Sequence, residues 1–398
     1  MTHDFTIQLE KLAQAPDLLK QHHLDVWLTF VRETPQTPDP ALGLILGLDM
    51  TWLSAFLVAQ NGKKIAIVGR FDADNVQRMG GYDEVIGYDA DIFPDLKAAL
   101  DRLNPTTIAI NYSESDTAAD GLSYGLWRLL NTSLANTPYK HRLVSAEPLI
   151  GSLRGCKTSS EIERIRTAIR TTEEIIAAVT QFLKPGQGEE DVYQFVREQF
   201  KARGVVPAWD NCPTVTAGPD SPYGHTLPSN NYKTAAGQLV HMDLGVLQND
   251  YTSDLQRVWY LKKPDEDSIP EPVQKGFNVV HGAILAAADV LKPGIEAWKV
   301  DETARKALVA QGYPEYQHAT GHHIGRSVHD GATVLGPRWP RYGKTVEGKV
   351  ETGNVFTLEL GVHVPEYGFI GLEEDVLVTE SGIEWLSKPQ TEIMVIKV

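Results

Sequence analysis

The sequence predicts a two-domain protein, with an α/β domain over residues 1–155 followed by an α+β domain over residues 156–398. Three observations lead to this prediction. A chain of 398 residues exceeds the usual length of one domain. Its first part alternates helical and strand patterns. Its second part contains a four-residue sequence that occurs twice.

The first part carries amphipathic helix patterns and short apolar strand patterns. The expected helices are 7–22 and 122–134, and the expected strands are 24–31, 55–58, 64–68 and 107–111. Asn61 and Gly62, between two of these strands, are a hairpin signal. No catalytic constellation stands out here, which favours a supporting or dimer-forming role.

The second part contains an internal repeat. Leu-Lys-Pro-Gly occupies 183–186 and returns at 291–294, 108 residues later. The same offset relates Arg197 to Arg305 and Gly204 to Gly312. Each copy shows a helix, a turn, a second helix ending at glycine, and then strands. We therefore expect a duplicated ααββ unit about a pseudo-twofold axis, with an antiparallel sheet and a cleft between the halves.

Carboxylates interrupt apolar strands in this second part. Asp243 shares one face of an alternating strand with His241, and Asp254 follows after a short connection. Glu359 and Glu373 each lie within a later apolar strand. Hydrogen-bonded core aspartates are one interpretation of the first pair. Because so many buried carboxylates repel one another, two divalent cations are the simpler neutraliser.

The histidines cluster. Four of the twelve, His318, His322, His323 and His329, lie within twelve residues and are flanked by glycines, which favours a functional role. Carboxylates with one imidazole suit manganese, iron, cobalt or zinc better than calcium. The His-Glu-x-x-His spacing is absent, which disfavours the single-zinc helical proteases.

Composition narrows the classes further. The formal charge of −15 argues against nucleic-acid partners. The sequence contains no run of eighteen apolar residues, so we expect no membrane-spanning helix. The first residues do not resemble a secretory signal. Cys156 and Cys212 fit reduced thiols, so we expect a cytoplasmic protein. The sequence contains neither a Gly-x-Gly-x-x-Gly motif nor a P-loop, so we do not expect nucleotide binding.

These residues resemble the superfamily of creatinase, prolidase and methionine aminopeptidase (M24), which has the pita-bread fold. The segments 242–245 and 253–257 look like its two-aspartate hairpin. The segment 321–325 resembles its Gly-His-Gly-Ile-Gly turn, with His323 in place of a glycine. The segment 357–361 resembles its Thr-Ile-Glu-Pro-Gly strand, with Leu360 in place of proline. Residues 1–155 look like the creatinase-type N-terminal domain.

The resemblance implies two divalent metal ions, with manganese first and cobalt, zinc or iron as alternatives. Their implied ligands are Asp243, Asp254, His322, Glu359 and Glu373. Asp254 and Glu373 correspond to bridging ligands, around a water that the two ions turn into a hydroxide nucleophile.

The resemblance also implies the catalytic residues. Glu359 corresponds to the general base. His225, His318 and His329 correspond to histidines that bind the scissile carbonyl and the substrate. His323 matches no catalytic position, and we expect it to be a packing or supporting residue.

The domain order is that of aminopeptidase P and prolidase. We therefore expect a homodimeric metallopeptidase that hydrolyses Xaa-Pro bonds, as a dipeptidase or an aminopeptidase, in small peptides with proline beside the scissile bond. Two alternatives remain. One is a hydrolase of the same fold acting on a small non-peptide C–N bond, and the other is a catalytically silent binding module.

One position departs from the family pattern. These enzymes commonly carry an arginine two residues before the last glutamate ligand, and this chain has Gly371 there. Arginine binds carboxylates in a bidentate manner, which glycine cannot do. Either Arg326, Arg338 or Arg341 takes over this role, or dipeptides are not the preferred substrate.

Overall fold

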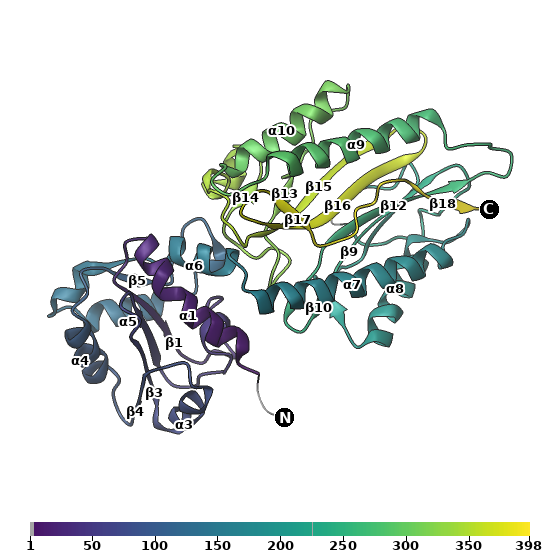
Figure 1. Ribbon diagram of the computed structural model, residues 1–398. Coiled ribbons are helices and arrows are strands. Elements are labelled where there is room, and N and C mark those ends of the chain that lie inside the picture. The colour runs from purple at the N-terminus through teal and green to yellow at the C-terminus, as the bar shows by residue number, and fades with distance from the viewer. Residues whose placement is uncertain (1–3, 225) are drawn as a thin grey trace. The chain divides into compact units, whose positions relative to one another are not determined.

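The computed structural model describes residues 4–224 and 226–398. The chain divides into two compact units, Met1–Ser160 and Glu161–Val398 (Figure 1). The domain boundary expected between residues 155 and 156 stays a prediction. Among the described residues, no helix has the length and apolar sequence needed to cross a membrane.

The first unit contains a six-stranded sheet in the order β4-β3-β2-β1-β5-β6. Its strands are β1 (Val26–Val31), β2 (Ser54–Ala59), β3 (Lys64–Gly69), β4 (Glu84–Tyr88), β5 (Ile108–Ile110) and β6 (Leu143–Ser145). β1, β2 and β3 pair antiparallel, and the remaining pairs are parallel. The four strands expected from sequence are confirmed. β4 and β6 were not expected, because they are short and only half-buried.

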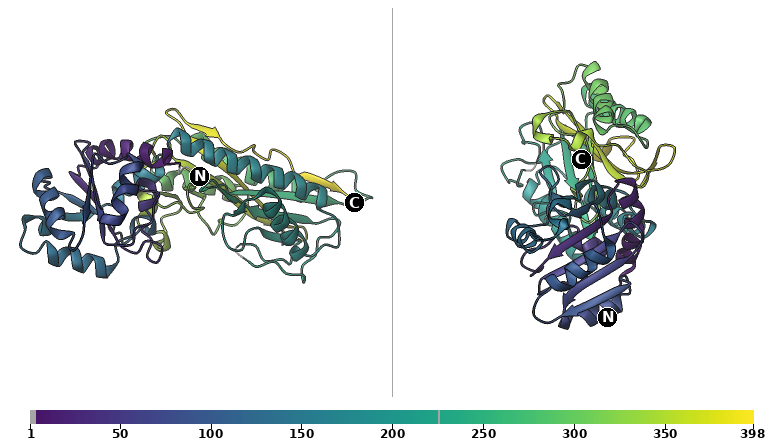
Figure 2. Two further views of the ribbon diagram at one scale, coloured as in Figure 1. Left: turned by 90° about the horizontal axis from the view of Figure 1, so that it is seen from below. Right: turned by 90° about the vertical axis from the view of Figure 1, so that its left-hand side faces the viewer.

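Helices cover both faces of this sheet (Figure 2). They are α1 (Thr6–Gln21), α2 (Leu42–Ile45), α3 (Arg70–Met79), α4 (Phe93–Leu103), α5 (Tyr124–Ser133) and α6 (Glu147–Gly155), with short 3-10 turns at Thr117–Ala119 and Pro138–Arg142. Trp27 packs with α1 and α6 on one face. Leu28 packs with α4 and α5 on the other. Because both faces are buried, β1 is apolar almost throughout, as is typical of α/β sheets.

The second unit contains a seven-stranded sheet, β15-β16-β12-β9-β8, with β17 beside β16 and β18 beside β12. Its strands are β8 (Thr214–Ala217), β9 (Leu239–Leu244), β12 (Leu255–Lys262), β15 (Val355–Val364), β16 (Gly368–Val378), β17 (Ile383–Trp385) and β18 (Met394–Lys397). Only β18 pairs parallel, so the expected antiparallel sheet is present. Smaller sheets join β7 (Val206–Pro207), β10 (Val246–Gln248) and β11 (Tyr251–Thr252), and β13 (Gly321–His322) with β14 (Val334–Leu335).

Two helix pairs accompany this sheet, α7 (Ser159–Phe182) with α8 (Glu189–Arg203), and α9 (Glu271–Val290) with α10 (Ala297–Ala310). 3-10 turns occupy Pro340–Tyr342 and Thr345–Glu347. α9 and α10 share an apolar core with β15 and β16. α7 runs beside the strands in Figure 2, and its Thr180 accepts a hydrogen bond from Trp259 of β12 at 2.9 Å.

Strand alternation separates two kinds of glutamate on β16. Glu373 faces the side of the sheet that carries Gln256, whereas Glu374 faces the opposite side. There Glu374 accepts hydrogen bonds from Arg257 at 3.0 Å and Ser387 at 2.6 Å. Its charge is therefore balanced inside the protein, and the charge of Glu373 must be balanced in another way.

Gly321 lets the backbone of β13 approach β15 closely. A Cβ atom at this position would lie 2.0 Å from the carbonyl oxygen of Thr357, a backbone atom that cannot move aside. The next residue, His322, donates its backbone N–H to Thr357 Oγ1 at 3.2 Å. The absence of a side chain at Gly321 therefore sets the position of His322.

We predict that Gly321→Ala destabilises the protein by about 1–3 kcal/mol, because the added methyl group must push two strands apart. Gly282→Ala is the matched control, since an added Cβ meets nothing within 4 Å and the site is an exposed helix position. Alanine there should be neutral or stabilise by up to about 1 kcal/mol. Urea unfolding measures both variants, and equal midpoints would contradict the close-approach argument.

Candidate metal centre

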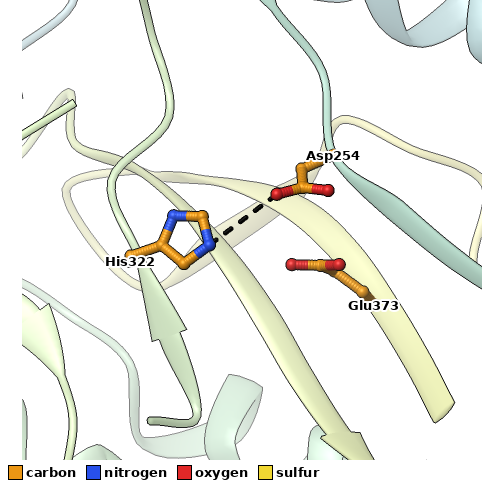
Figure 3. A group of neighbouring side chains, drawn as sticks. All are labelled: Asp254, His322 and Glu373. Carbon is orange, nitrogen blue, oxygen red and sulfur yellow. Dashed lines mark ion pairs between the residues drawn. The ribbon is translucent and has the colours of Figure 1, made fainter. Parts of the chain in front are cut away.

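Three side chains from distant parts of the second unit converge on one point. Asp254 precedes β12, His322 lies on β13 and Glu373 lies on β16 (Figure 3). One ligand atom from each lies within 4.8 Å of the others. His322 Nε2 is 3.7 Å from Asp254 Oδ2. Asp254 and Glu373 are 119 positions apart in the sequence, and His322 approaches them from the separate two-stranded sheet of β13 and β14.

Glu359 and Asp243 also belong to the carboxylate cluster. Glu359 pairs with Glu373 across β15 and β16, and its Oε1 is 3.9 Å from His322 Nε2. On the other side, Gln256 of β12 pairs with both Glu373 and Asp243. Residues opposite one another in adjacent strands point to the same face. All five residues expected as ligands therefore lie on or beside one face of the sheet.

A further carboxylate, Asp375, belongs to this cluster and was not expected as a ligand. Its Oδ2 accepts the backbone N–H of Asp254 at 3.2 Å, and it is fully buried. It lies two residues after Glu373 on β16 and therefore shares the face of Glu373. Its contact holds the backbone that carries Asp254.

The pKa values of four carboxyl groups in the cluster are raised above their usual values. Burial, and then the neighbouring carboxylates, raise the pKa of Asp254 and of Glu373 well above their usual values. Burial raises the pKa of Asp243 to about 7. Burial, together with the charge of Asp243, raises the pKa of Glu359 to about 8. Burial is the first cause of each shift, and at Asp254, Glu359 and Glu373 the neighbouring negative charges add to it.

The donor set fits divalent cations. One oxygen each of Asp243, Asp254, Glu373 and Asp375 is buried without a hydrogen-bond partner. Such oxygens are costly unless a cation or proton meets them. His322 Nδ1 lies 3.2 Å from the carbonyl oxygen of His323, and donation to that oxygen leaves Nε2 as the ligand atom. Carboxylate oxygens with one imidazole nitrogen suit manganese, iron, cobalt or zinc.

The expected catalytic histidines fall into three places. The ring of His329 packs edge-on against that of His322, with centroids 4.4 Å apart. His318 lines a pocket beside Glu359. His225 lies outside the described residues. His323 packs on Phe356 with ring centroids 4.1 Å apart, which confirms its expected packing role.

A buried ion pair on α10 holds the loop that carries His318. Arg305 donates to the His318 carbonyl at 2.8 Å and bonds Asp301 at 2.7 Å. Asp301 in turn accepts the Thr320 N–H at 3.2 Å, and the Thr320 carbonyl accepts the N–H of Glu359 at 2.8 Å. The loop is thereby tied to the strand that carries a carboxylate of the cluster.

Sequence reasoning did not single out Gln256 and His241 as site residues. Gln256 Nε2 donates to Glu359 Oε2 at 3.1 Å and to Glu373 Oε2 at 2.9 Å. Its Oε1 lies 3.0 Å from His241 Nε2. Burial lowers the pKa of His241 to about 4. The available signal was the period-two alternation, which puts Gln256 on the face of Asp254 and His241 on that of Asp243.

A small pocket adjoins the cluster. It is lined by Thr214, Tyr223, Gly224, His241, Asp243, Gln256, Tyr316, His318, Glu359 and Phe369.

The three arginines considered as replacements for an arginine at residue 371 contact aromatic rings. Arg326 lies over Tyr251, Arg338 over Trp298 and Arg341 over Trp339. Within the described part of the chain none of them lines this pocket.

Known proteins resemble this chain along most of its length. A Xaa-Pro dipeptidase of Pyrococcus furiosus is 28% identical over 79% of this chain and 89% of its own. A Xaa-Pro dipeptidase structure from Bacillus anthracis covers 98% of this chain and 100% of its own, with a TM-score of 0.73 at 21% identity. An X-Pro aminopeptidase structure from Thermotoga maritima covers 97% and 99%, with a TM-score of 0.70 at 21% identity. At these identities the two structures show a shared fold, with mixed α and β content.

The family profile gives the assignment. The profile of metallopeptidase family M24 matches residues 163–380. This match spans more than half of the chain and includes all the carboxylates of the cluster and His322. It confirms the resemblance expected from the motifs. The chain belongs to metallopeptidase family M24.

Proposed function

We propose that this chain is a dinuclear metal-dependent exopeptidase that hydrolyses Xaa-Pro bonds. The observation that carries the proposal is the convergence of Asp254, His322 and Glu373 within 4.8 Å, in a domain of family M24. Relatives named Xaa-Pro dipeptidase, from two Pyrococcus species, support the substrate class. The substrate is a small peptide with proline beside the scissile bond.

The proposed ligands are Asp243, Asp254, His322, Glu359 and Glu373. The cations are two divalent ions, with manganese first and cobalt, zinc or iron as alternatives. When bound, such ions supply Lewis acidity toward the scissile carbonyl and an activated water. The unpartnered oxygens of the cluster support this assignment, because cations would satisfy lone pairs that the protein leaves unmatched.

The remaining chemistry belongs to the side chains. Glu359 is the proposed general base, and the N–H of Gln256 on its Oε2 keeps the carboxylate turned toward Glu373. His318 and His329 are the proposed substrate-binding histidines, because His318 lines the pocket and His329 packs edge-on against His322. His225 is the third proposed member of this group.

The same proposal includes the finer architecture. Residues 1–155 are the creatinase-type domain, and 156–398 are the pita-bread catalytic domain built from the duplicated unit. Matching turn conformations support the duplication, with φ of +89° at Gly186 and +85° at Gly294. The cytoplasmic location and the homodimer rest on the sequence resemblance. Both cysteines are thiols, which agrees with a reducing compartment.

We predict that Asp254→Asn lowers kcat/KM by about a hundredfold or more and reduces the bound metal, because an amide is a weak ligand where a carboxylate is needed. Asp265→Asn, at an exposed position away from the cluster, is the control. Metal analysis, turnover and circular dichroism are measured on both proteins. Near-normal turnover by Asp254→Asn would contradict the dinuclear assignment.

We predict that His329→Ala lowers turnover by about a hundredfold while metal content stays unchanged, because the ring contacts His322 and is proposed to contact substrate rather than metal. His141→Ala, an exposed histidine of the first unit, is the control and should retain full turnover. Loss of metal in the His329 variant would show that the histidine ligand is misassigned.

We predict that the manganese-loaded protein cleaves Ala-Pro or Ala-Pro-Ala at least about a hundredfold faster than Ala-Ala-Ala, since an Xaa-Pro bond lacks the N–H that general peptidases use. Steady-state release of alanine measures all three substrates. Equal rates on the three peptides would contradict proline specificity. No cleavage by protein with two bound metals would favour hydrolysis of a non-peptide C–N bond.

A further inference from the structure

The pocket beside the carboxylate cluster contains polar atoms that the protein itself leaves unsatisfied. His241 and Thr214 both line this pocket. His241 Nδ1 and Thr214 Oγ1 are buried and lack a hydrogen-bond partner. Both residues are more than nine-tenths buried, with 4% and 2% of their surface exposed. Buried groups of this kind indicate a ligand that completes their hydrogen bonds.

The direction of hydrogen bonding identifies what His241 offers. In the ionised form that holds a cation, Glu359 and Glu373 only accept, so the Gln256 group that bonds both of them must be its N–H₂. The carbonyl oxygen of Gln256 therefore faces His241, and His241 Nε2 must donate to it over 3.0 Å. A neutral imidazole with a proton on Nε2 carries a lone pair on Nδ1. His241 thus presents an acceptor, which suits an N–H group of a ligand.

The register of the sheet puts a second polar group of the pocket diagonally across from this acceptor. Thr214 of β8 pairs with Asp243 of β9, two residues from His241 on the same face. Its hydroxyl can donate to a carbonyl oxygen. An acceptor and a donor separated in this way can bind the N–H and the C=O of one amide lying between them, because these two groups point in opposite directions.

Aromatic rings form the other wall of the pocket. Tyr223 and Phe369 stack with centroids 4.3 Å apart, and the edge of His241 meets Phe369 at 5.1 Å. Among the lining residues that the structure describes there is no lysine or arginine. This wall suits an uncharged ligand group, because burying a carboxylate there without a counter-ion is costly.

Gly371 belongs to the same arrangement. A Cβ atom at this position would lie 2.5 Å from both Gln256 Oε1 and His241 Nε2. The Gln256–His241 hydrogen bond therefore occupies the space in which any side chain at residue 371 begins. The Gln256–His241 pair leaves room only for glycine at residue 371. A lysine or arginine side chain at this position would collide with the pair.

We propose that His241 and Thr214 form a subsite for a neutral amide group of the substrate, so that the enzyme prefers peptides or amides extending past proline over dipeptides with a free carboxylate. This inference rests on the proposed Xaa-Pro activity. In the bound state the substrate N–H donates to His241 Nδ1, and its carbonyl accepts from Thr214. The preferred substrate class is Xaa-Pro-Yaa and Xaa-Pro-amide.

The test compares Ala-Pro, Ala-Pro-NH₂ and Ala-Pro-Ala on the manganese-loaded protein, with His241→Leu and His241→Asn as variants. Leucine removes the acceptor, whereas asparagine retains a side-chain carbonyl near the position of Nδ1. The wild type should cleave both neutral substrates about tenfold or more faster than Ala-Pro, measured as kcat/KM. His241→Leu should raise KM for the neutral substrates about tenfold more than it raises KM for Ala-Pro, because any effect transmitted through Gln256 is common to all three substrates.

The variants separate a binding role from a structural one. Partial recovery of KM in His241→Asn supports the subsite. Preference of the wild type for Ala-Pro, or an equal loss on all three substrates in His241→Leu, would overturn it while leaving the Xaa-Pro activity in place. Cleavage of Ala-Pro-NH₂ but not Ala-Pro-Ala would restrict the supported class to primary amides.

A binding measurement keeps the two proposals distinguishable. If the metal-loaded protein cleaves none of the three substrates, the Xaa-Pro activity fails, and calorimetric titration with prolinamide and with proline then decides on the subsite. Tighter binding of prolinamide, lost in His241→Leu, supports the subsite. Equal affinity for the two compounds overturns it.

Discussion

The constraint on which the second unit depends is the burial of several carboxylates on one face of an antiparallel sheet. β16 shows two ways of balancing such charge on a single strand. Glu374 points to one side and meets Arg257 and Ser387. Glu373 points to the other, where the neighbouring groups are Glu359, Asp243 and Asp375. On the first side Arg257 balances the charge, and on the second side the proposed divalent cations would do so.

The shape of the site follows from the absence of side chains at three glycines. Gly321 lets β13 approach β15 so that His322 reaches the carboxylates. Gly361 and Gly371 face each other across β15 and β16. A Cβ at Gly361 would meet the Phe369 ring at 2.2 Å. The space left by these two glycines holds the Phe369 ring and the Gln256–His241 hydrogen bond. The polar groups of the pocket therefore depend on the absence of side chains at these positions.

Much of the fold could be predicted from the sequence because periodicity is a local property. The strands at Val26–Val31, Ser54–Ala59 and Lys64–Gly69 carry long apolar patterns and were recognised. The strand at Leu143–Ser145 has only three half-buried residues, too few for a pattern. The carboxylates were recognised because charge within an apolar strand is locally conspicuous. Gln256 was not, because a neutral polar side chain on a strand is ordinary until its cross-strand neighbours are known.

The sequence by itself determined the family, the candidate ligands and the residue type at position 371, since each is a matter of identity and spacing along the chain. Tertiary structure decided which of these side chains meet. The pairing of Gln256 with Asp243 on one side and Glu373 on the other sets the hydrogen bonds that orient His241. Strand register joins residues more than a hundred positions apart, and no local pattern encodes which neighbour a side chain will have.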